Sequence, residues 1–242
     1  MPYKIHASSA NPRLLILLTD ESEESVRIIN RLIDQQIELN FDGEAPKNRC
    51  FISVISYNCS VKDLCSGWLK EFDANPLRYE TLKKLTPDGA GGIVEIEVRL
   101  PVWIEPNDEP FLGEYYANAI RLIIELTKTW SVKHADSPVP MVLDCSYDSH
   151  VDNALSEIDQ LKRISTPDGC VLFFGSYSNT DHINQSAFSH VPKEWFSLLR
   201  PVNIETNVAK TQIGIFDRNV VCSFIQALTD PFAEEPGFTG FV

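Results

Sequence analysis

Residues 14–25 read LLILLTDESEES, and this stretch decides the fold. Five apolar residues, Leu14 to Leu18, run without a polar break, and a group of acids and hydroxyls follows them. An uninterrupted apolar run of this length, followed at once by a helical pattern, is typical of a strand buried on both faces of a parallel sheet. Asp20 and Ser22 are then expected just past the carboxyl end of a central strand, where open α/β sheets bind their ligands.

Strands and helices are expected to alternate along most of the chain, which predicts an α/β fold with a mostly parallel sheet covered on both faces. The expected strands are 50–57, 94–100, 140–144 and 170–177, and the expected helices are 26–40, 114–130, 151–161 and 220–228. Residues 94–100 alternate strictly between apolar and polar, which predicts a half-exposed strand at a sheet edge. Residues 62–85 have no clear period. We expect residues 1–12 to form a loosely held N-terminal arm and residues 13–242 a single domain.

The charge of the chain excludes some classes of partner. The 242 residues carry 21 Lys and Arg against 34 Asp and Glu, a formal charge of -13, which repels nucleic acid and anionic lipid. We therefore expect neither nucleic acid nor a membrane as a partner. The sequence has no charged and then apolar leader, and no apolar run near the roughly 20 residues of a membrane span. A soluble, cytoplasmic protein is the expectation, and the absence of a Cys-x-x-Cys pair gives no support to a zinc knuckle or a redox motif.

Oxygen ligands are expected to gather at the carboxyl ends of the strands. Asp20 and Ser22 follow one expected strand, Asp144 ends another, Glu114 stands where a loop meets a helix, and Glu24 lies in the first helical turn. Such a set suits a hard divalent cation, namely magnesium, manganese or calcium. The alternative is that Asp20 and Ser22 cap the following helix, because these residue types satisfy its free amide groups. Both interpretations fit the spacing.

Several motifs resemble those of von Willebrand factor A-type (VWA) domains, in particular bacterial cytosolic members associated with tellurium resistance and signalling. Asp20-x-Ser22 is similar to the opening of their metal-ion-dependent adhesion site, which usually reads Asp-x-Ser-x-Ser. The other similar stretches are NPLR at 75–78, PDGAGG at 87–92, LPVWIEP at 100–106 and ADS at 135–137. The resemblance is best over residues 13–177. It implies a Rossmann-like sheet, mostly parallel with an antiparallel edge strand, helices on both faces, and a protein that binds partners.

The sequence departs from that family pattern at two hydroxyl positions. Glu24 replaces the second serine of the first loop, and Glu114 stands where the second loop usually has a threonine, while Asp20, Ser22 and Asp144 are kept. The longer, charged side chains disturb the usual octahedral arrangement. We therefore expect a degenerate metal site and no required cofactor, with Mg²⁺ as the ion if the added carboxylates still hold one.

Two functions remain open from the sequence. The first is a non-catalytic VWA protein–protein interaction module of a bacterial signalling, stress or defence system, with a protein partner such as a kinase, a phosphatase or an AAA+ ATPase. Its expected contact residues are Phe111, Leu112, Tyr115 and Tyr116, which could instead pack beneath their own loop. The second is a metal-dependent phosphoesterase or nucleotide-binding enzyme that uses the acidic cluster.

Overall fold

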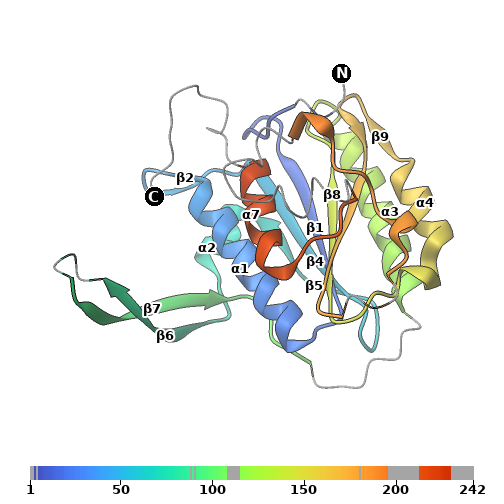
Figure 1. The fold of residues 1–242 in the computed structure, drawn as a ribbon. Helices are drawn as coiled ribbons and strands as arrows, with labels where there is room; N and C mark the ends of the chain where they lie inside the picture. The colour runs from blue at the N-terminus through green and yellow to red at the C-terminus, as the bar shows by residue number, and fades with distance from the viewer. Residues whose placement is uncertain are drawn as a thin grey trace.

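A five-stranded sheet forms the centre of the protein in a computed structural model that describes residues 3, 5–87, 89, 91–107, 115–179, 181, 183–195 and 213–229 (Figure 1). The strand order is β11-β8-β1-β4-β5. Four strands run parallel, namely β1 (Arg13–Thr19), β4 (Cys50–Ser56), β8 (Met141–Ser146) and β11 (Leu172–Tyr177). The edge strand β5 (Lys62–Trp68) is antiparallel to β4. Every residue of β1 is buried, so the prediction of a central strand from residues 14–18 is confirmed.

Helices cover both faces of this sheet and enclose two separate apolar cores. Leu15 and Leu17 of β1 point into the core formed with α1 (Glu23–Leu39), α2 (Leu69–Ala74) and α7 (Arg218–Thr229). Leu14, Ile16 and Leu18 point into the core formed with α3 (Tyr116–Lys133) and α4 (Leu155–Lys162), which follows a short 3₁₀ turn, η1 (Val151–Ala154). The prediction of an α/β fold with a mostly parallel sheet and helices on both faces is therefore confirmed.

A two-stranded hairpin, β6 (Arg78–Pro87) and β7 (Ile93–Val102), projects from the body of the protein (Figure 1). Its two strands pair with each other from Arg78 opposite Val102 to Pro87 opposite Ile93. Residues 94–100 were predicted to form a half-exposed strand at a sheet edge. They lie in β7, which within the described residues pairs with β6 and not with the main sheet, whose antiparallel edge strand is β5. Alternation of apolar and polar residues shows that one face of a strand is more apolar than the other, but it does not show which strand pairs with that strand.

Short elements complete the described part of the chain. They are β2 (Phe41–Asp42), β3 (Ala45–Pro46), β9 (Ser165–Thr166), β10 (Gly169–Cys170), η2 (Gln185–Ala187) and η3 (Lys193–Trp195). Part of the expected N-terminal arm touches the body, since the Tyr3 and Trp195 rings lie 5.9 Å apart edge to face and Ile5 N donates to Asp168 Oδ1 at 3.0 Å. None of the described helices is both long enough and apolar enough to cross a membrane.

Candidate functional site

Asp20 lies directly after β1, where the neighbouring strands β1 and β8 end, and both of its carboxylate oxygens accept hydrogen bonds. Oδ1 accepts from the backbone N of Ser22 at 3.0 Å and from Ser22 Oγ at 2.8 Å. Oδ2 accepts from the backbone N of Tyr147 at 2.6 Å, which joins the end of β1 to the end of β8. Ser22 stands at the N-cap position of α1, but its side chain makes no capping hydrogen bond. The helix-cap interpretation is therefore right about the position of Ser22 and wrong about its side chain.

Asp144 lies inside β8, where it is fully buried, and not at the end of the strand as expected. It stands opposite Leu18 in the strand register, so its side chain faces the core formed with α3 and α4. Its Oδ2 accepts from Tyr116 Oη at 2.8 Å and from Tyr177 Oη at 2.6 Å, and its Oδ1 accepts from Ser146 Oγ at 2.5 Å. Burial raises the pKa of Asp144 to about 6, although these hydroxyl donors oppose the shift.

Three tyrosines form the network around Asp144: Tyr116 was predicted to contact a partner instead, and Tyr57 and Tyr177 had no predicted functional role. Tyr57 Oη donates to Ser146 Oγ at 2.6 Å, which extends the network to the end of β4. The same dipeptide, Ser-Tyr, stands at the ends of three strands, at 56–57, 146–147 and 176–177; β4 and β8 end at the serine and β11 at the tyrosine. This repetition is a signal in the sequence that could have pointed to the network.

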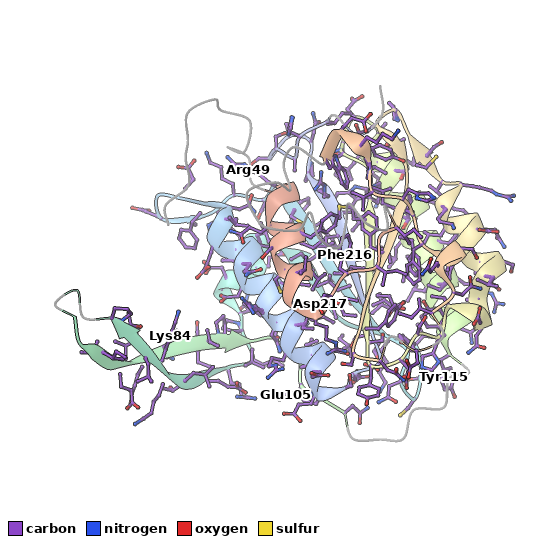
Figure 2. The ribbon with its side chains drawn as sticks, viewed as in Figure 1. Arg49, Lys84, Glu105, Tyr115, Phe216 and Asp217 are labelled. Atoms are coloured by element: carbon purple, nitrogen blue, oxygen red, sulfur yellow. The ribbon has the colours of Figure 1, made fainter. Side chains whose placement is uncertain are left out.

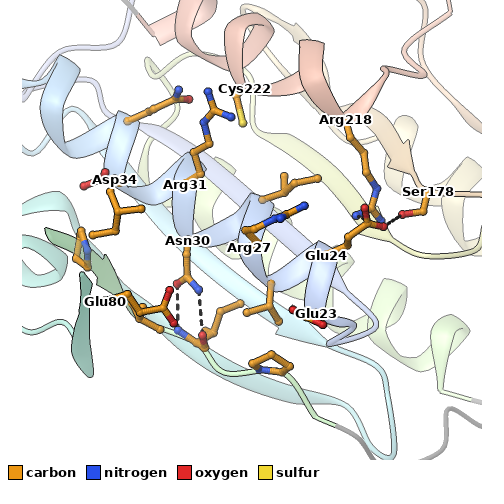
Figure 3. A pocket seen from close by; sticks show the side chains of 18 of the residues that line it. Glu23, Glu24, Arg27, Asn30, Arg31, Asp34, Glu80, Ser178, Arg218 and Cys222 are labelled. Carbon is orange, nitrogen blue, oxygen red and sulfur yellow. Dashed lines mark hydrogen bonds and ion pairs between the residues drawn. The ribbon is translucent and has the colours of Figure 1, made fainter. Parts of the chain in front are cut away.

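Arg218 brings a positive charge to the ends of β1 and β8 from the first turn of α7. Its guanidinium donates to the carbonyl of Ser146 at 2.7 Å and to Ser25 Oγ at 3.4 Å, and it forms an ion pair with Glu24 at 3.3 Å. Glu24 also accepts a hydrogen bond from Ser178 (Figure 3). The Ser178 hydroxyl and the guanidinium lower the pKa of Glu24. A cation supplied by the chain itself therefore lies beside the predicted metal ligands.

The residues as they are folded do not fit the divalent cation that the VWA resemblance implies. Asp20 and Asp144 each accept three hydrogen bonds from hydroxyl or amide groups of the protein, which occupy most of the roughly four lone-pair positions of a carboxylate. A second cation would also lie close to the Arg218 guanidinium. Among the residues that the structure describes, no group of three or more His, Cys, Asp or Glu side chains is arranged to hold a metal ion.

The predicted partner-binding residues are only partly described. Phe111, Leu112 and Glu114 lie outside the described residues. Tyr115 is half-buried, whereas Tyr116 is fully buried and uses its hydroxyl on Asp144. Burial leaves Tyr116 no surface to offer a partner in this structure, so of the described pair only Tyr115 remains a candidate contact residue.

A groove with a volume of about 1720 Å³ runs over the outer face of α1, between the base of the hairpin and α7. Figure 2 shows Lys84 on the projecting hairpin and Glu105 near its base, and Figure 3 shows Arg27, Arg31 and Asp34 on α1 within the groove. Asn30 fixes the chain that returns from the hairpin, because its Oδ1 accepts from Trp103 N at 2.8 Å and its Nδ2 donates to the Ile104 carbonyl at 3.0 Å. The groove therefore lies between elements that are joined to one another.

Exposed apolar side chains gather on the hairpin beside this groove. Seven of the eleven large hydrophobic side chains that are exposed among the described residues lie on or directly before the hairpin: Leu77, Tyr79, Leu82, Leu85, Ile93, Val94 and Ile96. Leu82, Val94 and Ile96 share the hairpin face that also carries Arg78, Glu80 and Lys84, and these three charged residues line the groove. The hairpin face that carries Leu82, Val94 and Ile96, called here the apolar face, is thus the one turned toward the groove, although these three side chains do not line it.

The charges along α1 in the groove have no ion-pair partner within the described residues. Arg27, Arg31 and Glu38 are exposed and Asp34 is half-buried, and none of them forms an ion pair there. Burial, and then the charge of Glu38, raises the pKa of Asp34 to about 6. The neighbouring Glu24 and Glu105, in contrast, pair with Arg218 and Arg78.

A comparison of the sequence with models of protein families gave no match, and a comparison with curated proteins gave none either. Function must therefore be argued from the strand-end network, the groove and the hairpin.

Proposed function

We propose that this protein is a non-catalytic protein–protein interaction module with a VWA-type fold, and that the groove and the hairpin form its binding surface. The observation that carries the proposal is the exposed apolar face of the hairpin. Leu82, Val94 and Ile96 are 49%, 42% and 41% exposed on a ribbon that projects from the body (Figure 1). A contiguous apolar surface of this kind on a water-exposed protein marks an interaction site.

The arrangement of the sheet supports the VWA part of the proposal. The sheet is mostly parallel, β5 is its antiparallel edge strand, and helices cover both faces, which is the architecture that the motifs imply. Asp20 and Ser22 follow the central strand, as the Asp-x-Ser motif requires.

The hydrogen bonding and burial of Asp20 and Asp144 support a non-catalytic role. A general base or a metal ligand needs a carboxylate that a substrate, a water or an ion can reach. Both oxygens of Asp20 and both oxygens of Asp144 accept hydrogen bonds from the protein, and Asp144 is fully buried. The proposal assigns the module to a bacterial cytoplasmic signalling, stress or defence system, in which a kinase, a phosphatase or an AAA+ ATPase would act beside it.

Affinity capture from the native cell tests this function. The variant Leu82→Ser/Ile96→Ser removes two side chains from the apolar face of the hairpin, and the control Thr81→Ser/Lys83→Ser changes the opposite face. Because all four side chains are exposed, both variants should melt at the wild-type temperature. We expect the apolar-face variant alone to lose the proteins that co-purify with the wild type.

Two results would contradict the proposal. Equal recovery of partners with both variants would remove the hairpin from the binding surface. Turnover of phosphate esters that is abolished by Asp20→Ala would instead favour the metal-dependent enzyme.

A further inference from the structure

Four charged side chains on the outer face of α1 form an unusual order of charges. Arg27 and Arg31 stand four residues apart, and Asp34 and Glu38 follow, again four residues apart. Side chains at this spacing are neighbours on a helix surface, so each pair places like charges side by side. Arg31 and Asp34, three residues apart, are opposite charges at the middle of the stripe, but within the described residues none of the four forms an ion pair.

The four residues lie in one stripe along the helix. Arg27 and Glu38 are separated by about three helical turns and so point in nearly the same direction, with Arg31 and Asp34 between them. The stripe lies in the groove beside the hairpin, with Arg27, Arg31 and Asp34 visible in Figure 3. Its positive half is nearer the N-terminus of α1 and its negative half nearer the C-terminus.

The charge order along one α1 is complementary to the charge order along a second α1 that runs in the opposite direction. If a second α1 lies antiparallel across the stripe, Arg27 meets Glu38 of the second copy and Arg31 meets Asp34 of the second copy. Both pairs are centred between Leu32 and Ile33. A two-fold axis at that level therefore aligns each arginine with its acidic partner and generates each pair twice. Such a self-complementary patch is what a two-fold symmetric interface requires. We infer that the protein forms a two-fold dimer in which the α1 stripes of two copies pair antiparallel and the apolar hairpin faces flank them.

The size of the surface explains why the hairpin belongs to this interface. A specific interface buries about 800 Å² on each partner. The 17 residues of α1 give a face about 25 Å long and about 10 Å wide, which is well below that area. One face of the ten-residue hairpin adds a strip about 33 Å long. Together the two strips approach the area that a stable dimer needs, and the hairpin supplies the apolar part that the charged stripe lacks.

This inference rests on the proposed function, because it names a second copy of the chain as the partner at the same groove. A different partner with a basic surface is the competing occupant, since the chain has a formal charge of -13. The stripe itself is electrically balanced, which favours a copy of itself over a uniformly basic surface.

Charge exchange between two variants tests the dimer. The variant Arg27→Glu/Arg31→Glu makes the stripe wholly acidic, and Asp34→Lys/Glu38→Lys makes it wholly basic. Sedimentation velocity of the wild type should show a dimer, and each variant alone should self-associate at least about tenfold more weakly, because like charges then face each other. An equimolar mixture of the two variants should recover a one-to-one dimer, which native mass spectrometry would identify by mass. Thermal melting of each variant verifies that it is folded.

The control is Lys128→Glu/Lys133→Glu on α3, which changes the net charge as much as the acidic variant does but lies on the other face of the sheet. It should leave the dimer unchanged. A wild-type monomer, or a mixture in which the two variants stay apart, would overturn the dimer. If the wild type is a monomer but captures other proteins through the apolar face of the hairpin, the dimer fails and the proposed function stands.

Discussion

Replacing Asp144 with asparagine should remove a pH dependence of stability between about pH 4 and pH 6. Burial raises the pKa of this carboxyl from 3.8 to about 6 in the folded protein, whereas unfolding returns it to its ordinary value. The folded state therefore binds the proton more tightly than the unfolded state does. The contribution of Asp144 to the free energy of unfolding is complete below about pH 4 and is lost as the pH rises through 6. A difference of about two pKa units corresponds to about 3 kcal/mol.

Urea unfolding of the wild type and of Asp144→Asn at several pH values between 4 and 7 measures this effect. The asparagine keeps one carbonyl oxygen for the hydroxyls of Tyr116 and Tyr177 and carries no charge at any of these pH values. We expect the stability of the wild type relative to the variant to fall by up to about 3 kcal/mol from pH 4 to pH 7. Asp34→Asn removes a half-buried carboxyl whose pKa burial also raises to about 6, so it should flatten the pH dependence in the same direction and provides a second, independent test.

Parallel stability curves for the wild type and Asp144→Asn would refute the reasoning. A wild type that gains stability relative to the variant toward pH 7 would refute it more strongly. That outcome is expected of a carboxylate whose charged form is stabilised by a cation, and it would return Asp144 to the set of metal ligands.

Three further predictions concern the strand ends and β11. Arg218→Ala should lower the free energy of unfolding by about 1–3 kcal/mol, because it removes the hydrogen bond to the buried Ser146 carbonyl and the ion pair with Glu24. The exposed Arg121→Ala should cost less than about 1 kcal/mol, and equal losses in urea unfolding would contradict this. Gly175→Ala should cost about 1–3 kcal/mol, since the new Cβ would lie 2.5 and 2.6 Å from two aromatic rings, and an unchanged melting temperature would show that these rings move aside. Isothermal titration of the metal-stripped protein with magnesium, manganese and calcium should give no binding heat, because Asp20 and Asp144 already accept hydrogen bonds; micromolar binding that disappears in Asp20→Ala would restore the metal site.

The central strands and the long helices could be predicted because burial on both faces and a helical period leave clear patterns in the sequence. The run Leu14–Leu18 and the repeat of Val26, Ile29, Ile33 and Ile37 fix β1 and α1 without reference to the rest of the chain. The hairpin could not be predicted in the same way. Residues 78–87 read RYETLKKLTP, where the two leucines stand three apart and not two, so β6 lacks the period of a strand.

The site was predictable only as far as position along a strand determines it. Asp20 and Ser22 follow β1 directly, so their place at the strand end needed no knowledge of the neighbouring strands. Asp144 was expected at a strand end because the apolar run stops there, but β8 continues to Ser146 and Asp144 lies within it. Arg218 is nearly 200 residues from Asp20 in the sequence, and only the packing of α7 against α1 brings its guanidinium to Glu24 and Ser25.

The hydrogen bonding at the strand ends bears on how the groove would bind a partner. In an adhesion site that depends on a metal ion, the ion supplies the positive charge that meets the partner, so binding responds to metal. Here Arg218 supplies a positive charge at the strand ends, and the hydroxyls of Tyr116, Tyr177 and Ser146 stabilise the buried acid. These groups bind one another inside the protein, and Asp144 is fully buried. Under the proposed function, recognition depends on the surface, namely on the charge stripe of α1 and the apolar face of the hairpin. On that argument, association through this groove should weaken as salt screens the stripe and should be indifferent to chelators.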